Sequence, residues 1–78
     1  MHFVYSLESD DQKHWYVGLT DDLDRRMAEH NSGKSSHTSK YGRWKLKTYT
    51  AFQDRDRAET CERYLKSHSG RAFTKKHL

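Results

Sequence analysis

A helix predicted after Thr20 places ionisable side chains where apolar residues are expected. Residues three and four positions apart share a helix face, so Arg26 and His30 fall in the stripe that contains Leu23 and Met27. A guanidinium binds anions through a planar fork of donors, and an imidazole exchanges protons near neutral pH. Arg26 and His30 are therefore the first candidates for anion binding and proton transfer.

A second predicted helix contains a carboxylate in its apolar stripe. Glu62 lies among Ala58, Cys61 and Leu65 at helical spacing. A buried and unpaired carboxylate is strongly penalised by lost solvation, so we expect Glu62 to be paired or to border a cleft. A fixed salt bridge to Arg26, or a side chain that reaches solvent from the edge of the stripe, is the structural alternative. The chemical alternative is a hard oxygen ligand for Mg²⁺ or Mn²⁺.

Two tyrosines occupy the arms of a predicted hairpin. Tyr5 lies on the first arm and Tyr16 on the second, and Gly18 leaves the face of Tyr16 without a side chain two residues later. A glycine inside a strand is typical of a place where another group approaches closely. Aromatic residues in strands also serve core and cross-strand packing, which is the alternative role for both rings.

Three strands and three helices are expected to position these residues. Residues 2–7 and 14–20 are rich in β-branched and aromatic residues and flank a polar loop. In the second strand, the face that we expect to pack against the core carries Trp15, Val17 and Leu19. Residues 43–52 alternate as a third strand. We expect four residues of this strand to lie on the same side of the sheet: Trp44, Leu46, Thr48 and Thr50.

Cap residues predict where the helices begin and end. Thr20 or Asp21 can cap the first helix, and Asn31 with Gly33 can end it. Asp54 is expected to cap a second helix that runs to about Ser67. The residues after Gly70 suit a last short helix.

The element order predicts an α+β fold, a small three-stranded antiparallel sheet with two to three packed helices. We expect residues 1–78 to form a single domain, because 78 residues leave no room for a second core. The low hydrophobic content of 32% leans toward disorder, whereas the aromatic content of 13% favours a compact fold.

The charge is unevenly distributed along the chain. The net charge is +4, with −4 over residues 1–29, +5 over residues 30–53 and +3 over residues 54–78. The middle segment contains no acidic residue, and we expect the phosphate backbone of a nucleic acid to bind along it. The alternative is that this segment is only a basic face in contact with solvent. Its basic residues are Lys34, Lys40, Arg43, Lys45 and Lys47.

Cysteine content and hydropathy indicate the cellular compartment in which we expect the protein. Cys61 is the only cysteine, so no internal disulfide is expected. No apolar run approaches the roughly 20 residues needed to span a bilayer, and we expect a cytoplasmic protein without a membrane contact.

Taken in order, these residues resemble the GIY-YIG nuclease domain, specifically the small stand-alone domains similar to the N-terminal nuclease of the UvrC repair protein. Residues 3–5 (FVY) stand at the first triplet of the family and residues 16–18 (YVG) at the second. Arg26 and His30 match the first helix of the family, and Glu62 matches the glutamate of its second helix. Residues 69–73 are similar to one branch of these small domains.

The resemblance implies a metal-dependent endonuclease that hydrolyses phosphodiester bonds, of DNA in preference to RNA, in repair, recombination or related processing. In such a site Tyr5 is the expected general base and Tyr16 the residue that orients water or phosphate. The site must then lower the pKa of a phenol from about 10. Arg26 would stabilise the phosphate, and Glu62 would hold Mg²⁺ or Mn²⁺. His30 would either relay a proton or hold the tyrosine or the phosphate in place.

Without a recognition domain in these residues, we expect weak and salt-sensitive nucleic-acid binding, with a homo-oligomer or a protein partner supplying specificity. One alternative function is a non-catalytic nucleic-acid binding module that retains the fold. Another is a protein-interaction domain whose basic face meets an acidic partner. Six histidines and Cys61 also raise zinc binding, although no spacing resembles a closed zinc site.

Overall fold

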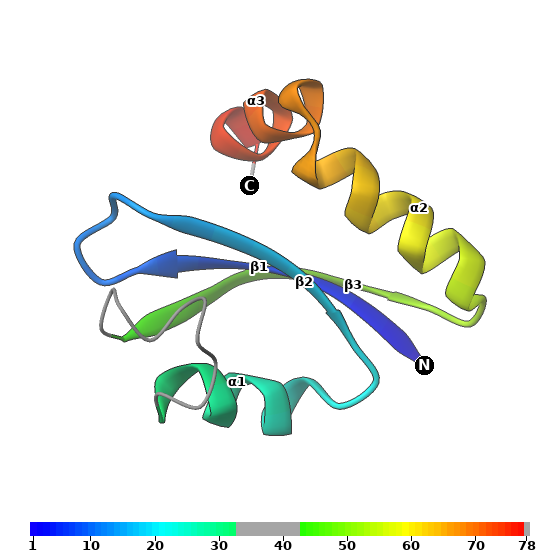
Figure 1. Ribbon diagram of the computed structural model, residues 1–78, viewed down its shortest axis with the longest axis horizontal. Coiled ribbons are helices and arrows are strands. Elements are labelled where there is room, and N and C mark those ends of the chain that lie inside the picture. The colour runs from blue at the N-terminus through cyan, green and yellow to red at the C-terminus, as the bar shows by residue number, and fades with distance from the viewer. Residues whose placement is uncertain (33–42, 78) are drawn as a thin grey trace.

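The computed structural model describes residues 1–32 and 43–77. In chain order the elements are β1 (His2–Ser9), β2 (Trp15–Thr20), α1 (Leu23–Asn31), β3 (Trp44–Phe52), α2 (Arg55–Lys66) and α3 (His68–His77) (Figure 1). Within this part of the chain, no helix is long and apolar enough to cross a membrane.

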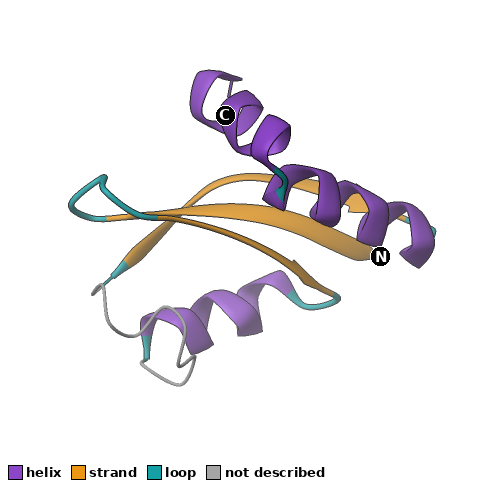
Figure 2. Ribbon diagram, turned by 45° about the horizontal axis from the view of Figure 1, so that its top comes forward, coloured by secondary structure: helices purple, strands orange, loops and turns teal. Residues whose placement is uncertain are grey.

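The strands form one antiparallel sheet in the order β2-β1-β3, so β1 is the central strand. Helix α1 lies on one face of the sheet, and α2 with α3 lies on the other (Figures 1 and 2). The predicted α+β fold is confirmed, including its element order and the third helix.

Strand β1 is buried on both faces because helices cover both sides of the sheet. Its residues Val4, Tyr5, Ser6 and Leu7 are each at most 2% exposed. Side chains alternate along a strand, and Tyr5 and Leu7 point toward α1, where they form the core with Trp44. Val4 and Ser6 point to the other face, which α2 covers.

The face of β2 that packs against the core differs from the predicted one. Trp15 is 39% exposed, whereas Tyr16, from the opposite face, packs against the core. The physical reason is position, because Trp15 is the first residue of an edge strand and borders a cavity instead of a packed helix. Val17 and Leu19, which share its face, are half-buried.

A β-bulge in β3 changes which of its residues share a face. Thr48 pairs with Ser6, but Leu46 pairs with the next residue of β1, so Lys47 is an extra residue in the ladder. Directly paired residues share a face of the sheet. Trp44 and Leu46 therefore lie on the α1 side and the threonines on the α2 side, which corrects the prediction that all four share one side.

Helix α1 begins after both of its predicted caps, with an N-cap one residue after Asp21 and two residues after Thr20. The N-cap is Asp22, whose side chain accepts a hydrogen bond from the backbone N–H of Arg25. Thr20 supports this turn, since its hydroxyl accepts from the N–H of Asp22 at 3.1 Å. Asp21 instead forms an exposed ion pair with Arg25.

Helix α2 begins as predicted, with Asp54 as the N-cap that accepts from the N–H of Asp56. Helix α3 differs from the prediction because it begins at His68, so Gly70 lies inside it. A Cβ atom at Gly70 would overlap the backbone carbonyl of Tyr64. This glycine therefore permits the tight corner between α2 and α3.

Candidate active site

The pairing of β1 with β2 places the Tyr5 phenol over Gly18. The two residues are direct partners in the ladder. A Cβ atom at Gly18 would overlap the Tyr5 hydroxyl and would lie 2.9 Å from Cε1 of Tyr16. The notch that the sequence predicts at Gly18 is thus filled by the ring of Tyr5, and this close approach sets the position of the phenol.

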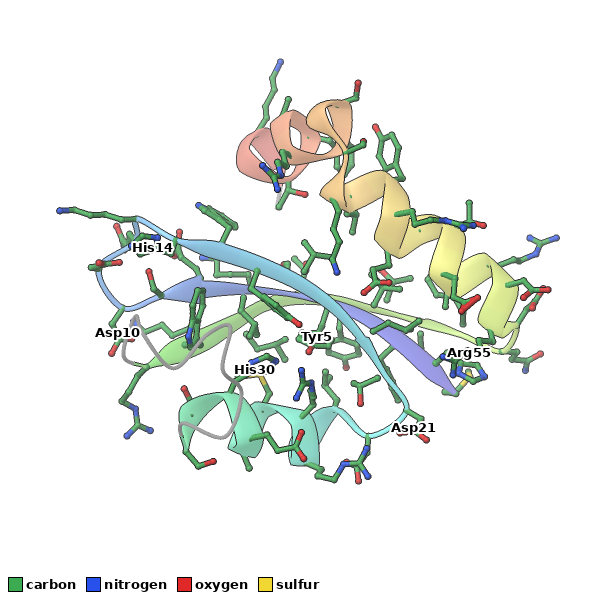
Figure 3. The ribbon with its side chains drawn as sticks, in the orientation of Figure 1. Tyr5, Asp10, His14, Asp21, His30 and Arg55 are labelled. Carbon is green, nitrogen blue, oxygen red and sulfur yellow. The ribbon has the colours of Figure 1, made fainter. Side chains whose placement is uncertain are left out.

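The Tyr5 hydroxyl is the centre of a buried polar network. It lies 2.8 Å from Nε2 of His30, and both residues are 1% exposed. The rings of Tyr16 and His30 meet edge to face with centroids 4.9 Å apart. The Arg26 guanidinium donates hydrogen bonds to both tyrosines. One cation, one imidazole and two phenols therefore form a continuous cluster. Figure 3 shows two of its members, Tyr5 and His30, between the sheet and α1.

Burial keeps two members of this network neutral. Burial, with a smaller contribution from Tyr16, raises the pKa of Tyr5 to about 12 despite the opposing effect of Arg26. Burial and the positive charge of Arg26 lower the pKa of His30 to about 4. Near pH 7 the Tyr5 hydroxyl thus keeps its proton, and a neutral His30 can accept it as a hydrogen bond at Nε2.

The raised pKa of Tyr5 bears on the role expected of this residue. A general base needs a pKa that the site lowers, but the pKa of Tyr5 is raised because the ring is buried. Tyr16 is only half-buried and lies between Arg26 and the side chain of Lys66, whose Nζ atom is 6.0 Å from the centre of its ring. Of the two phenols, Tyr16 is the one accessible to water.

Arg26 remains charged at the edge of the network. Burial acts to lower the pKa of Arg26, but hydrogen bonds to Glu29, Tyr16 and Tyr5 outweigh that effect and raise it. Its Nη1 atom is 3.0 Å from Oε1 of Glu29, one turn along α1. The guanidinium is thus held between the buried phenols and a groove at the surface.

Glu62 approaches the same groove from the other side of the sheet. Its side chain is 22% exposed, and Oε2 lies 3.2 Å from Nζ of Lys66 on the same helix. The stripe predicted for α2 is present, with Ala58 buried and Glu62 at its half-buried edge. Within the described residues, Arg26 and Glu62 are each paired along their own helix and not with each other, so the fixed salt bridge is absent.

Arg26 and Glu62 line one groove of about 560 Å³. Its floor is the end of β2 at Leu19 and Thr20, its first wall is α1, and its second wall is α2. Asp21 and Arg55, which also border the groove, lie at the same end of the sheet (Figure 3). Two helices on opposite faces of the sheet therefore meet at the open edge of β2.

The predicted basic track does not reach this groove in the part of the chain that the structure describes. Lys34 and Lys40 lie outside the described residues. Arg43, Lys45 and Lys47 are exposed on or next to β3, and β1 separates β3 from β2. Nζ of Lys47 lies 3.7 Å from Oε1 of Glu8, so this lysine is engaged at the far edge.

Sequence reasoning missed two charged residues next to Glu62: Glu59, which lines the groove, and Lys66, which is not among its lining residues. Glu59 lies one turn before Glu62 and Lys66 one turn after it, and Glu59 lines the same wall as Glu62. Arg55, which pairs with Glu59 at 3.5 Å, completes this wall. The three-residue and four-residue spacing around Glu62 is the signal that could have identified Glu59 and Lys66.

The donor set of the groove fits a hard divalent cation. Within the residues that the structure describes, no group of three or more His, Cys, Asp or Glu side chains could hold a metal ion. Mg²⁺ is commonly bound by one or two carboxylates together with substrate phosphates and water. Glu62, with Glu59 on the same wall, meets that requirement.

Two paired strands that supply tyrosines, an arginine on the following helix and a glutamate on α2 define a small α+β domain of the catalytic type. The chain matches the GIY-YIG catalytic domain over residues 1–76 and belongs to that family. The resemblance stated from the sequence is thereby confirmed, and membership of this family indicates nuclease chemistry.

Relatives of known sequence and structure agree with this assignment. The chain is 39% identical over 71 residues to a UPF0213 protein of Halalkalibacterium halodurans, covering 90% of this chain and 74% of the relative. It is 39% identical over 66 residues to a UPF0213 protein of Lactococcus lactis subsp. cremoris, covering 83% and 66%. The solution NMR structure of a UPF0213 protein from Bacillus halodurans matches with a TM-score of 0.58 at 37% identity, covering 95% of this chain and 79% of that one.

Proposed function

We propose that this domain is a nuclease that hydrolyses phosphodiester bonds of nucleic acid in the groove at the β2 edge, with a divalent cation held at Glu62. The observation that carries the proposal is that Arg26 and Glu62, from helices on opposite faces of the sheet, line one groove. Phosphoryl transfer needs charge stabilisation on the phosphate and an oriented water. The groove offers a cation and a carboxylate at its two walls.

We assign the phosphate contact to Arg26. Its guanidinium is anchored by Glu29 and by two phenols, so the donors that remain are oriented before the substrate arrives. A donor fixed in this way stabilises negative charge that develops on the phosphoryl oxygens without reorganisation. Tyr5 and His30 act as positioning residues, since both are buried behind Arg26.

We assign the activation of water to Tyr16 in place of Tyr5. In this step the ionised Tyr16 oxygen takes a proton from water, the water oxygen bonds to phosphorus as the P–O bond to the leaving oxygen breaks, and the leaving oxygen takes up a proton from solvent. Arg26 donates to the Tyr16 hydroxyl and Lys66 lies by its ring, so two cations lie close to this side chain. The cation at Glu62, when bound, supplies Lewis-acid stabilisation of the phosphate and the leaving oxygen.

We also propose a preference for DNA over RNA and a role in repair, recombination or related processing, as the resemblance of the sequence to small repair-type domains implies. The net charge of +4 supports a polyanionic substrate. A homo-oligomer or protein partner would supply specificity, because the groove offers no groups arranged to read bases.

The direct test is incubation of the purified protein with branched, nicked, single-stranded and duplex substrates in Mg²⁺ or Mn²⁺. Metal-dependent cleavage that Glu62→Ala abolishes supports the proposal. Asp56→Ala, which removes an exposed carboxylate from the same helix, is the matched control and should retain cleavage. Metal-independent binding without cleavage of any substrate would instead support a non-catalytic binding module.

A further inference from the structure

A second cavity, of about 540 Å³, lies on the other side of Tyr16 from the network with His30. It is bordered by the end of the β1–β2 hairpin at Lys13 and His14, by the start of β2 at Trp15, and by α2 and α3. Figure 3 places His14 at the hairpin end, and Figure 1 shows the α2–α3 corner over this face of the sheet. Its size falls in the range of roughly 300–1,000 Å³ typical of small-ligand sites.

An indole at the mouth of this cavity is partly exposed to solvent. Trp15 is 39% exposed, whereas the other tryptophan, Trp44, is 4% exposed. Only 32% of the residues are hydrophobic, so leaving an indole in water forgoes a large share of the apolar area that the chain could bury. The indole therefore presents a flat apolar surface that a planar ligand could cover.

The polar groups around Trp15 are cationic. Lys13, Lys66 and Arg71 line the cavity together with His14, and no aspartate or glutamate is among the described residues that line it. The nearest acid of the hairpin turn, Asp11, accepts hydrogen bonds from the Ser9 hydroxyl and from the backbone N–H of Lys13. Cations next to an exposed aromatic ring suit a ligand that combines phosphates with a flat base.

Two residues that line the cavity contact residues of the candidate active site. Tyr16 lines the cavity and also contacts Arg26 and His30 in the buried network. Lys66 lines the cavity and lies 3.2 Å from Glu62, which borders the groove. A nucleotide held in the cavity would therefore place its neighbouring phosphodiester next to the groove.

We propose that this cavity binds one unpaired nucleotide of a single-stranded nucleic acid, with the base stacked on Trp15 and its phosphates bound by Lys13, Lys66 and Arg71. The proposal rests on the proposed nuclease function for the position of the scissile bond, which lies next to the bound nucleotide. A base inside a duplex is already stacked and paired, so it cannot lie on the indole unless it leaves the helix. The site therefore selects substrates with single-stranded segments, such as flaps and branched junctions.

The test is quenching of tryptophan fluorescence by a ten-residue oligothymidine, titrated without divalent metal so that no cleavage occurs. Quenching is expected because the exposed indole stacks with a base, whereas Trp44 is buried. Trp15→Ala should weaken binding about 5- to 150-fold, and Trp15→Phe should restore part of it. The affinity of Trp15→Ala is read by fluorescence anisotropy of a labelled oligomer.

Matched controls separate this site from general electrostatics. Arg71→Ala should weaken binding and reduce the salt slope by about 0.7, the value for one single-strand phosphate contact. Arg63→Ala removes an exposed arginine outside the cavity and should leave the slope nearly unchanged. Tyr49→Ala, which removes an aromatic ring that is 56% exposed on another surface, should leave affinity unchanged. Equal losses for Arg63→Ala and Arg71→Ala would overturn the proposal.

Further titrations identify the kind of ligand that the cavity binds. They also distinguish a failure of this proposal from a failure of the proposed nuclease function. An abasic oligomer should not quench, and a duplex should quench less than a single strand, while oligouridine and oligothymidine compare RNA with DNA. An acidic peptide that binds as tightly and depends on Trp15 would overturn the proposal. Stacking on Trp15 without cleavage of any substrate refutes the nuclease and not the site. Cleavage with unchanged single-strand affinity in Trp15→Ala refutes the site and not the nuclease.

Discussion

The hydroxyl of Tyr5 lies 2.8 Å from Nε2 of His30, although the two residues are 25 positions apart in the sequence. Each is 1% exposed, so neither polar atom can exchange this partner for water. The hydrogen bond joins the central strand to α1 directly behind Arg26. We therefore expect this pair to hold the site in place and to contribute measurably to stability.

Replacing Tyr5 by Phe removes the hydroxyl and leaves a buried ring nitrogen of His30 without this partner. The free energy of unfolding should fall by about 1–3 kcal/mol, the usual penalty for a buried polar group that loses its hydrogen bond. Denaturant unfolding measures this change. Tyr49→Phe, at a tyrosine that is 56% exposed, is the control and should change stability by less than about 0.5 kcal/mol. Equal effects of the two substitutions would contradict the account.

Stability should depend on pH through His30. The pKa of His30 is about 4 in the folded protein, against an ordinary value of 6.5, so the unfolded chain binds more protons between these two pH values. The contribution of His30 to stability is therefore complete above about pH 6.5 and is lost as the pH falls toward about 4. The total is on the order of 3 kcal/mol. Burial is the largest cause of this shift, Arg26 adds to it and Glu29 opposes it. The rings of Tyr5 and Tyr16 pack against the imidazole.

The measurement is the free energy of unfolding from pH 4 to 7 for the wild type and for His30→Gln, which keeps hydrogen-bonding atoms but does not titrate. Carboxylates titrate in both proteins, so the difference between the two curves isolates His30. The difference should grow in favour of the wild type as the pH rises. Parallel curves would refute the low pKa.

A methyl group at Gly18 should disturb the site more than its size suggests. The Cβ atom of Gly18→Ala would overlap the Tyr5 phenol, and overpacking of this kind typically reduces stability by about 1–3 kcal/mol. Thermal unfolding measures the loss. In a Tyr5→Leu background the overlap with the phenol is relieved, so the same substitution should be less harmful there. A loss that does not depend on the residue at position 5 would argue against this contact.

Tyr16 and Tyr5 should differ in what their hydroxyls do. Tyr16→Phe should reduce the cleavage rate by about 10²–10⁴, the usual contribution of a general base, with little change in stability because the residue is half-buried. Tyr5→Phe should reduce stability and should affect the rate less. Single-turnover cleavage and denaturant unfolding of the same two variants separate the roles. A larger loss of cleavage rate in Tyr5→Phe than in Tyr16→Phe would indicate that Tyr5 is the general base.

The fold was largely predictable because local signals agreed with the global arrangement. The acidic cap at Asp54 and the alternation in β1 each pointed to the element that forms. The bulge at Lys47 was not predictable, because the ladder skips one residue there while the sequence continues its period of two. Trp15 was placed in the core because hydrophobicity does not reveal where an edge strand runs past its covering helix.

The site was predictable in its residues more than in their roles. Arg26 and Glu62 stood out as charges in apolar stripes, and the structure brings both to one groove. Sequence spacing cannot tell how deeply a ring is buried, so it did not reveal that burial raises the pKa of Tyr5. Nor did it reveal that Lys66, and not Arg26, is the ion-pair partner of Glu62.

The central claim is that Arg26 and Glu62 act on the same phosphate, and a double-mutant cycle in single-turnover cleavage with Mg²⁺ tests it most directly. Arg26→Ala and Glu62→Gln should each slow cleavage by about 10²–10³, and the double variant should be little slower than either one, because residues that act as a unit are not additive. Asp56→Asn should retain the wild-type rate. Cleavage by Glu62→Gln as fast as by Asp56→Asn, or losses that simply multiply in the double variant, would contradict the claim.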